Sequence, residues 1–323
     1  MYKIISTSPT FGKYSKKPLE LLSRNHCEVT FLSNQTPFFK TDFIEALKEA
    51  DGLILGFENI TDEILSNAPK LKIIAKHGTG VDNIDIVAAQ KRGIVVANAQ
   101  GANRHAVADF VFGTMLSISR KICESSNLVK RGDWQSIIGN DIYGKTLGVI
   151  GTGKIGKEVI RRAKGFNMDI LAFDLYPDRT LEQLNLVKYV SFDELIGTAD
   201  IITIHADLSN KSASMIGKSE FDRMKKEALL INTARGGIVD EDALYEALYS
   251  KKIKGAALDV FQTEPLGNHK LLELDNFFAT PHIAGYSEEA LVEVGFITAR
   301  NIINVLSGLD AEYEVSPCEG GLN

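Results

Sequence analysis

The sequence predicts an α/β protein with two doubly wound parallel-sheet domains. Short apolar segments rich in β-branched residues alternate with helical patterns along most of the chain. Such alternation is typical of a parallel sheet covered by helices on both faces. The 323 residues are many for one hydrophobic core and sufficient for two domains. A G-x-G-x-x-G pattern directly after a strand, at Gly151, occurs in the second half of the chain only.

The first hundred residues predict one complete α/β domain. Expected strands lie at 3–6, 29–32, 52–55, 73–75 and 95–97, and expected helices at 42–50, 61–67 and 85–92. Gly93 suits the C′ position that ends the last of these helices, because glycine adopts the left-handed conformation without steric cost. No phosphate-binding glycine pattern occurs in this half. We therefore expect it to be separate from the domain that carries Gly151.

A second βαβ series is expected at 145–282. One long helix, at 103–131, precedes it and is predicted to span the domain boundary. The later strands are expected at 201–205, 229–232, 256–258 and 277–279. The helical pattern at 287–306 has an apolar face that suits a return to the first domain. The second domain is thus predicted to be inserted into a discontinuous first domain, with a cleft between the two.

The segment Gly151-Thr152-Gly153-Lys154-Ile155-Gly156 fits a dinucleotide site. It follows an apolar strand pattern at 146–150 and opens a helical pattern at 155–166. In such a G-x-G-x-x-G turn, the glycines make the tight turn, admit a pyrophosphate and let the helix pack close to the strand. The start of the helix then offers free N–H groups and a positive dipole end to the phosphates.

An acidic residue at the expected distance indicates which dinucleotide binds. A second strand pattern, 170–173, ends in Asp174, which lies 18 residues after Gly156. The rule places an acidic residue about 20 residues beyond the turn, where it binds the ribose hydroxyls. Because a carboxylate repels a 2′-phosphate, the cofactor is expected to be NAD rather than NADP. The alternative is that Asp174 is only a solvated residue at a strand end.

Three later strands each end in residues with useful chemistry. Arg235, Glu264 and His282 follow the strands at 229–232, 256–258 and 277–279, and a parallel sheet places such ends at one edge. An arginine binds a carboxylate bidentately. A histidine exchanges protons near neutral pH, and a neighbouring carboxylate would orient its ring and favour the imidazolium. The alternative is that all three are ordinary surface residues.

Composition narrows the class of protein. The net charge of −6 argues against a general nucleic-acid binder. Cys27, Cys123 and Cys318 show no C-x-x-C spacing, so neither a disulfide framework nor a metal site is expected. The apolar run at 1–6 is too brief for a signal peptide, and no run reaches transmembrane length. We expect a soluble, cytoplasmic protein with no membrane or nucleic-acid partner.

Several ordered motifs resemble the D-2-hydroxyacid dehydrogenase family across essentially the whole chain. Besides the glycine turn with Asp174, they are the segments at 78–85, 103–109, 232–236, 259–265 and 280–285. The resemblance implies an NAD-binding Rossmann domain at 102–286 inserted into a discontinuous, flavodoxin-like substrate-binding domain at 1–101 and 287–323. It also implies a cleft that closes and a homodimer formed through the cofactor domain.

The resemblance also implies a role for individual residues. Arg235, Glu264 and His282 would be catalytic, with Arg235 on the substrate carboxylate and carbonyl, His282 as acid/base and Glu264 tuning it. Asp259 would contact the nicotinamide carboxamide, and backbone N–H groups at 77–80 would cradle the substrate carboxylate. The residues expected to bind the cofactor are Gly151, Gly153, Lys154, Ile155, Gly156, Asp174, His205, Thr233, Ala234, Asp259, His282 and Gly285. The residues expected to bind the substrate are Lys76, His77, Gly78, Thr79, Gly80 and Arg235.

Within the family the chain most resembles short 3-phosphoglycerate dehydrogenases, with departures that bear on the substrate. Those enzymes commonly carry an arginine after the strand at 52–55, where this chain has Gly56-Phe57-Glu58. Glu58 would oppose a phosphate, and Lys76 could compensate in part as a point charge. Glyoxylate or hydroxypyruvate reduction is therefore the main alternative to 3-phosphoglycerate oxidation. The regulatory C-terminal domain of longer relatives is not expected.

Two other classes of protein share parts of this pattern. S-adenosylhomocysteine hydrolase-like enzymes contain the same kind of cofactor domain, but they are normally longer. The C-terminal-binding-protein corepressors sense NAD and keep the same Arg, Glu and His, so these three residues do not exclude a binding protein without turnover.

Overall fold

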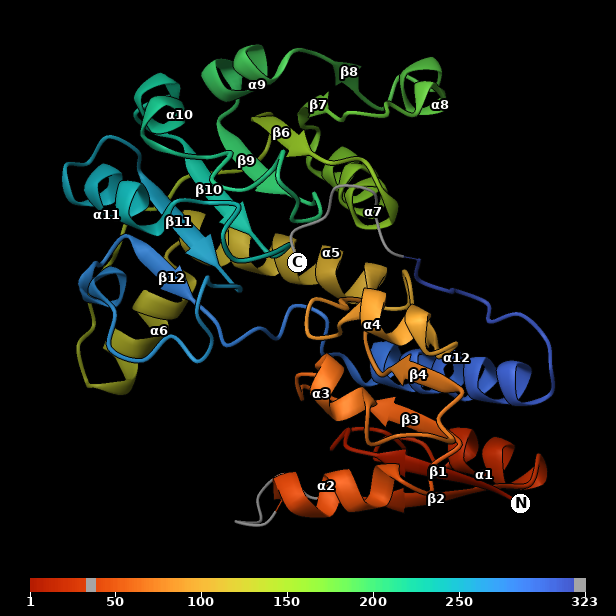
Figure 1. The fold of residues 1–323 in the computed structure, drawn as a ribbon. Coiled ribbons are helices and arrows are strands. Elements are labelled where there is room, and N and C mark those ends of the chain that lie inside the picture. The colour runs from red at the N-terminus through yellow and green to blue at the C-terminus, as the bar shows by residue number, and fades with distance from the viewer. Residues whose placement is uncertain (33–38, 317–323) are drawn as a thin grey trace. The chain divides into compact units, whose positions relative to one another are not determined.

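The computed structural model describes residues 1–32 and 39–316 and contains two compact units. Unit 1 comprises Met1–Asn103 and Tyr286–Asn323, and unit 2 comprises Arg104–Gly285 (Figure 1). Unit 2 is thus inserted into unit 1 along the chain. The sequence placed these boundaries at 101/102 and 286/287, close to those of the structure.

The described part of unit 1 contains a five-stranded parallel sheet in the order β2-β1-β3-β4-β5. This is the flavodoxin-type order of doubly wound sheets. Every residue of β3 and β4 is buried, as expected for central strands covered on both faces. The strands are β1 (Tyr2–Ser6), β2 (Cys27–Phe31), β3 (Gly52–Leu55), β4 (Ile73–Lys76) and β5 (Val95–Ala97).

Helices cover both faces of this sheet. One face packs on α1 and α12 through a core that includes Leu22, Ala299 and Ile302, and the other packs on α2, α3 and α4 through Leu47, Leu65 and Ala88. The C-terminal helix therefore belongs to unit 1. The helices are α1 (Lys17–Arg24), α2 (Phe39–Leu47), α3 (Asp62–Leu65), α4 (Ile86–Lys91) and α12 (Glu288–Leu306).

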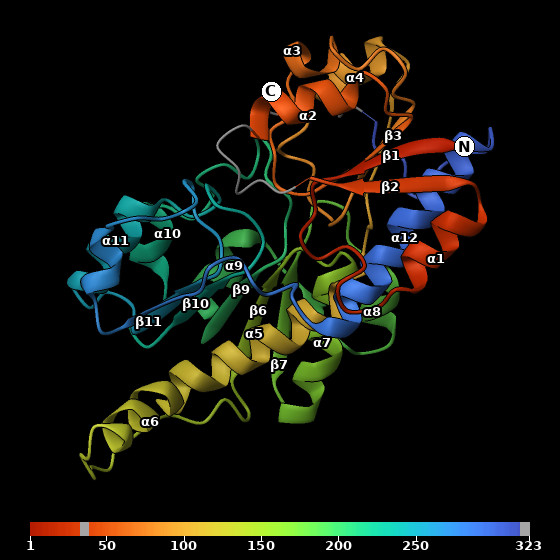
Figure 2. The same ribbon diagram turned by 90° about the horizontal axis from the view of Figure 1, so that it is seen from below.

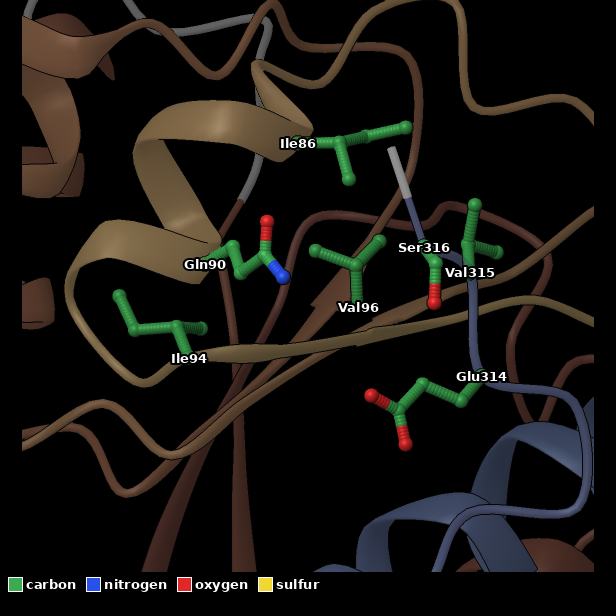
Figure 3. Close-up of a pocket in the computed structure, with 7 residues that line it drawn as sticks. All are labelled: Ile86, Gln90, Ile94, Val96, Glu314, Val315 and Ser316. Atoms are coloured by element: carbon green, nitrogen blue, oxygen red, sulfur yellow. The ribbon is translucent and has the colours of Figure 1, made fainter. Parts of the chain in front are cut away.

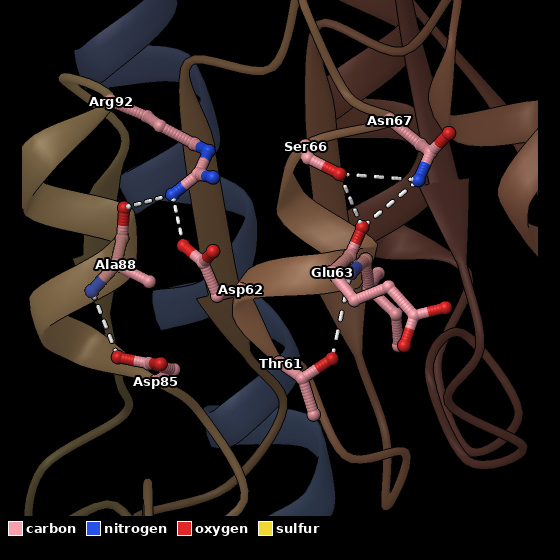
Figure 4. A network of polar contacts seen from close by, with 9 residues as sticks. Thr61, Asp62, Glu63, Ser66, Asn67, Asp85, Ala88 and Arg92 are labelled. Carbon is pink, nitrogen blue, oxygen red and sulfur yellow. Dashed lines mark hydrogen bonds and ion pairs between the residues drawn. The ribbon is translucent and has the colours of Figure 1, made fainter.

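Polar contacts fasten α3 to α4 on one face of unit 1. Arg92 donates both to Asp62 and to the carbonyl of Ala88, while Thr61 and Asp85 cap the two helices (Figure 4). The chain after α12 returns to the β5 edge, where the Val315 N–H donates to the carbonyl of Val96. These contacts secure the segments that flank the loops after β3 and β4.

A small pocket lies between α4, β5 and this returning segment. Its lining residues are Ile86, Gln90, Ile94, Val96, Glu314, Val315 and Ser316 (Figure 3). None of the predicted site residues lines it. The pocket is therefore a feature of the packing around α4 rather than of the predicted site.

Residues 104–285 form a seven-stranded parallel sheet in the order β12-β11-β10-β9-β6-β7-β8. In chain order this is the Rossmann arrangement with one further strand, and its direction of winding changes between β6 and β9. Ligands of such sheets bind beyond the carboxyl ends of the strands at that point. The strands are β6 (Thr146–Ile150), β7 (Asp169–Phe173), β8 (Lys188–Tyr189), β9 (Ile201–Ile204), β10 (Leu229–Asn232), β11 (Gly255–Leu258) and β12 (Phe277–Ala279).

Two helical layers enclose this second sheet. One core joins the strands to α5 and α7 through residues such as Val111 and Ile160, and the other joins them to α9, α10 and α11 through Leu195, Phe221 and Leu244. The helices of unit 2 are α5 (Arg104–Ser119), α6 (Ile122–Lys130), α7 (Lys154–Ala163), α8 (Arg179–Gln183), α9 (Phe192–Thr198), α10 (Lys218–Arg223) and α11 (Glu241–Tyr249). Short 3₁₀ turns, η1 (Lys164–Phe166) and η2 (Lys270–Glu273), complete the unit.

The prediction of one continuous helix at 103–131 is wrong. The structure has two helices, α5 and α6, which follow one another (Figure 2). The break lies at Lys121, whose φ of 56° is left-handed. A left-handed residue interrupts the helical hydrogen-bond ladder, and no glycine or proline at this point signals it. The sequence analysis also did not predict α1 or the short edge strand β8.

Among the residues that the structure describes, no helix is long and apolar enough to cross a membrane. In the same part of the chain, no group of histidine, cysteine and acidic side chains could hold a metal ion. Cys27 is buried and Cys123 exposed, and both are free thiols. Cys318 lies outside the described residues.

Candidate active site

The glycine turn after β6 has a geometry that only glycine permits at two positions. Gly151 has a φ of 91°, and a Cβ there would lie 2.5 Å from the carbonyl oxygen of His205. A Cβ on Gly156 would lie 2.1 Å from the carbonyl oxygen of Gly151. Both distances are far below van der Waals contact. A Cβ on Gly153, in contrast, would meet nothing within 4 Å, so this glycine faces open space.

The start of α7 offers free hydrogen-bond donors beside that open space. Gly153 is the N-cap and supplies no side-chain cap. Within the described residues, the N–H groups of Gly153 and Ile155 have no acceptor. Unpaired N–H groups at a helix N-terminus bind phosphate, because the helix dipole adds a partial positive charge. This turn therefore fits the pyrophosphate of a dinucleotide.

Asp174 is bound to the glycine turn rather than solvated at a strand end. Its Oδ2 accepts from the Thr152 N–H at 2.6 Å and from the Thr152 hydroxyl at 2.9 Å, and its Oδ1 accepts from the Tyr176 N–H at 2.8 Å. The charge of this carboxylate is thus fixed at the edge of the turn, where the ribose of a dinucleotide is expected.

Two further predicted cofactor residues follow β9 and β10. The His205 ring contacts the Thr203 hydroxyl at 2.9 Å through Nε2, and burial lowers the pKa of His205 to about 3, so its ring is neutral. The Thr233 hydroxyl is buried and has no partner within the described residues. An unpartnered buried hydroxyl at the carboxyl end of a strand in this sheet fits a bound polar ligand.

His282 and Glu264 form a hydrogen-bonded pair at the ends of β12 and β11. His282 Nδ1 lies 2.8 Å from Glu264 Oε2, while the Phe261 N–H donates to Glu264 Oε1 at 2.9 Å. The histidine side chain is 52% exposed, so it remains accessible. Because an ionised carboxylate only accepts, Nδ1 carries the hydrogen and Nε2 is left to exchange a proton.

Asp259 holds the loop on which His282 lies. Its carboxylate is buried and accepts from the Thr280 hydroxyl at 2.6 Å, the Ile283 N–H at 2.9 Å and the Ala284 N–H at 2.8 Å. Its carbonyl also accepts from the His282 N–H at 2.9 Å. These bonds hold His282 in a left-handed backbone conformation, with φ 55°, that non-glycine residues seldom adopt. The structure thus gives Asp259 a positioning role that the sequence did not suggest.

Arg235 lies on a loop that is fixed to the neighbouring strand end. The Asn232 side chain donates to the Arg235 carbonyl at 2.8 Å and accepts from the Ala234 N–H at 3.0 Å. A Cβ on Gly236 would lie 2.0 Å from the carbonyl oxygen of Phe261, so the loops after β10 and β11 are in contact. Strands β10, β11 and β12 are paired neighbours. Arg235, Glu264 and His282 therefore follow the carboxyl ends of three adjacent strands.

The predicted substrate loop of unit 1 presents three N–H groups. The carbonyls of Gly78 and Thr79 accept from the Ala99 N–H at 2.9 Å and from the Asn98 side chain at 2.7 Å. In the described part of the chain, the N–H groups of Gly78, Thr79 and Gly80 meet no acceptor. Consecutive free N–H groups of this kind bind anions. The His77 N–H departs from the expected set, because it donates to the Leu55 carbonyl at 3.0 Å.

The side chains of His77 and Lys76 form hydrogen bonds with other residues of unit 1. His77 Nδ1 lies 3.1 Å from the Ser8 hydroxyl, and burial together with the charge of Lys76 lowers the pKa of His77 to about 4. The Lys76 ammonium donates to the Gly56 carbonyl and, at 3.1 Å, to Asn83 Oδ1. These bonds tie together the loops that follow β3 and β4.

The fold and site together define a dinucleotide-binding α/β protein with a histidine–carboxylate pair suited to proton transfer. The family model "D-isomer specific 2-hydroxyacid dehydrogenase, NAD binding domain" matches residues 112–284. A glyoxylate reductase of Korarchaeum cryptofilum is 38% identical over 286 residues, which cover 86% of each chain. The chain therefore belongs to the D-isomer-specific 2-hydroxyacid dehydrogenase family, and NAD is its cofactor, as predicted.

Other relatives carry different names. A D-3-phosphoglycerate dehydrogenase of Methanocaldococcus jannaschii is 41% identical over 320 residues, which are 98% of this chain but 60% of the relative. The chain thus spans about three fifths of that protein. The solved D-lactate dehydrogenase of Lactobacillus jensenii with NAD+ has a TM-score of 0.80 and 28% identity, covering 98% of this chain and all of that one.

Proposed function

We propose that the protein interconverts a D-2-hydroxy acid and its 2-oxo acid with NAD as the redox partner. The observation that carries this proposal is the pairing of His282 with Glu264 at 2.8 Å, in the same unit as the glycine turn. His282 Nε2 gives a proton to the substrate oxygen during reduction and takes it back during oxidation. Bound NADH supplies the hydride, and the protein supplies position and charge.

The other predicted residues act in binding. Arg235 holds the substrate carboxylate and carbonyl, because its guanidinium suits bidentate contacts. The N–H groups of Gly78, Thr79 and Gly80 hold the carboxylate as an anion nest. Thr233, Ala234 and Gly285 line the nicotinamide half of the cofactor site, with Thr233 supported by its unpartnered hydroxyl.

The contacts of Lys76 favour a small, unphosphorylated substrate, such as glyoxylate or hydroxypyruvate. A phosphate needs a cation, and the ammonium of Lys76 is engaged by the Gly56 carbonyl and by Asn83. Nearby Glu58 has a buried carboxylate oxygen that would repel an anion. The sequence favoured 3-phosphoglycerate, and this remains the second candidate because relatives at 41% and 39% identity carry that name.

A substrate panel separates these candidates. Purified protein is assayed by NADH absorbance with glyoxylate, hydroxypyruvate and pyruvate, and with NAD and 3-phosphoglycerate in the reverse direction. The proposal expects the highest kcat/KM for an unphosphorylated acid. A higher value for 3-phosphoglycerate would establish the second candidate, and no turnover of any acid with intact NADH binding would favour a corepressor-like NAD sensor.

We propose further that the protein is a homodimer formed through unit 2. Large apolar side chains are exposed around α6 and the segment after it, with Trp134 89% and Ile138 92% exposed. Such a surface is typical of a protein–protein contact. Light scattering on the intact protein tests this, because Trp134→Ser with Ile138→Ser should lower the mass to that of a monomer. A monomeric wild-type protein would contradict it.

A further inference from the structure

Tyr189, the last residue of the edge strand β8, joins three segments of the dinucleotide-binding edge. Its hydroxyl lies 2.8 Å from the Thr152 hydroxyl in the glycine turn, and it accepts from the Asp178 N–H at 3.1 Å. Thr152 in turn contacts Asp174 through both its hydroxyl and its N–H. Strand ends β6, β7 and β8 are thereby connected through side chains.

The donor and the acceptor of each hydrogen bond from Asp174 through Thr152 and Tyr189 to Asp178 follow from the chemistry of the groups. The Asp174 carboxylate only accepts, so the Thr152 hydroxyl donates to it. Having used its one hydrogen, Thr152 must accept from Tyr189, and the Tyr189 oxygen then accepts from the Asp178 N–H. The Thr152 hydroxyl is buried, with the residue only 3% exposed. In such a site a broken bond leaves an unsatisfied polar group, which keeps the arrangement fixed.

These hydrogen bonds leave one carboxylate oxygen of Asp174 able to accept a further hydrogen bond from a ligand. Two donors from Thr152 occupy Oδ2, whereas within the described residues Oδ1 accepts only from the Tyr176 N–H. Because each carboxylate oxygen offers about two acceptor positions, the open position is on Oδ1. A ribose hydroxyl can donate to this position, and a 2′-phosphate cannot.

Two cations on the neighbouring helices are already paired. Lys157 on α7 binds the carboxylate of Asp178, and Arg179 binds Glu182 at 2.8 Å while its guanidinium lies 5.7 Å from the centre of the Tyr189 ring. NADP-binding sites use an arginine for the 2′-phosphate. With Lys157 and Arg179 engaged by carboxylates, the charge presented to the ribose comes from Asp174.

We infer that Tyr189 is a positioning residue for cofactor selectivity, which holds Thr152 so that Asp174 presents Oδ1 to the ribose and discriminates NAD from NADP. This rests on the proposed role of Asp174 at the ribose. Tyr189 contributes through Thr152 and is not a catalytic residue. The sequence alone gave no sign of it, because β8 has only two residues.

The test measures binding of NADH and NADPH to the intact protein without substrate, by titration calorimetry. Tyr189→Phe removes the hydroxyl and keeps the ring, so the affinity for NADH should fall about 5- to 30-fold, as for loss of one or two hydrogen bonds. The affinity for NADPH should change little, so the NADH/NADPH selectivity falls. Tyr249→Phe, on the exposed surface of α11, is the matched control and should leave both affinities unchanged.

Variants of Thr152 sharpen the test. Thr152→Val removes the hydroxyl and should lower NADH affinity at least as much as Tyr189→Phe, while Thr152→Ser keeps it and should retain most of the selectivity. In the double variant Tyr189→Phe/Thr152→Val the losses should not add, because both act through one chain of bonds. Fully additive losses, or equal losses for NADH and NADPH, would overturn the inference.

Asp174→Ala distinguishes an error about the positioning role of Tyr189 from an error about the proposed contact between Asp174 and the ribose. If this variant loses the preference for NADH while Tyr189→Phe keeps it, the inference alone is wrong. If Asp174→Ala also keeps the preference, the proposed ribose contact fails, and the inference falls with it. Thermal unfolding of each variant without cofactor checks that the selectivity change does not arise from loss of the fold.

Discussion

Both units of this chain carry a G-x-G loop at the carboxyl end of a parallel strand, yet the two loops have different chemistry. In unit 2 the loop leads directly into α7, and a Cβ on Gly156 would lie 2.1 Å from the Gly151 carbonyl oxygen. In unit 1 the loop after β4 runs through residues 81–85 before α4 begins, and a Cβ on Gly78 would be 3.6 Å from the nearest atom. A helix N-terminus suits a pyrophosphate, whereas isolated loop N–H groups suit one small anion.

The histidines beside these loops show the same contrast. His77 and His205 are half-buried and have no carboxylate partner within the described residues, and desolvation of their rings lowers their pKa values to about 4 and about 3. His282 is half exposed and has Glu264 at 2.8 Å. Burial, joined at His77 by the charge of Lys76, therefore keeps these two rings neutral, whereas His282 is accessible and has a carboxylate beside it, as proton transfer requires.

The largest expected effect tests this contrast between histidines. His282→Ala should lower kcat about 10²- to 10⁴-fold, as for loss of a general acid/base, with little change in NADH affinity. His269→Asn is a matched control in the same unit, because His269 also faces a carboxylate, Glu241, at 3.5 Å but is the N-cap of the 3₁₀ turn η2. Steady-state kinetics and NADH titration measure both. Wild-type turnover by His282→Ala would contradict the assignment.

A second substitution separates the two glycine loops. Gly156→Ala forces a methyl group against the Gly151 carbonyl, so it should cost about 1–3 kcal/mol of unfolding free energy and abolish NADH binding. Gly78→Ala, where the nearest atom is 3.6 Å away, should leave thermal unfolding unchanged. Gly153→Ala should also fold normally, yet weaken NADH binding, since its methyl group enters the open space beside α7. Equal stability of Gly156→Ala and Gly78→Ala would refute the packing argument.

The two strand-end carboxylates of unit 2 can be distinguished in a similar way. Asp259→Asn replaces an oxygen by a donor, so one of the Thr280, Ile283 and Ala284 donors loses its acceptor. We expect a loss of about 1–3 kcal/mol in stability together with a lower kcat, because the His282 loop loosens. Urea unfolding and kinetics measure these changes. Unchanged stability with weaker NADH binding would instead show direct contact with the cofactor.

The smallest expected effect is a dependence of stability on pH. The folded His77 takes up a proton only near pH 4, whereas an unfolded histidine does so near pH ~6.5. Between these values the unfolded state binds more protons, so unfolding free energy falls as the pH is lowered, by at most about 1.4 kcal/mol per pH unit. His77→Asn should reduce this slope in urea titrations between those pH values, and His26→Asn, at an exposed site of unit 1, should not.

The predictions from sequence were best where the backbone itself imposes a requirement. The left-handed φ of Gly151 and the close approach at Gly156 permit no other residue, so the glycine spacing identified the turn directly. The same local requirement placed Gly93, with φ 69°, at the end of α4. Short apolar segments located the strands that lead to Asp174, Arg235 and His282, although they did not reveal β8.

Other features depend on residues far apart in the chain, and only the tertiary structure decided them. The sequence alone determined two parallel-sheet units, the glycine turn and the strand ends that Arg235, Glu264 and His282 follow, because these features depend on local backbone geometry and on hydrophobic patterning. The folded chain decided that the Asp259 carboxylate faces the His282 loop, that the ammonium of Lys76 is held by Gly56 and Asn83, and that Tyr189 reaches Thr152. The physical reason is that burial and hydrogen-bond partners are set by segments that meet only on folding.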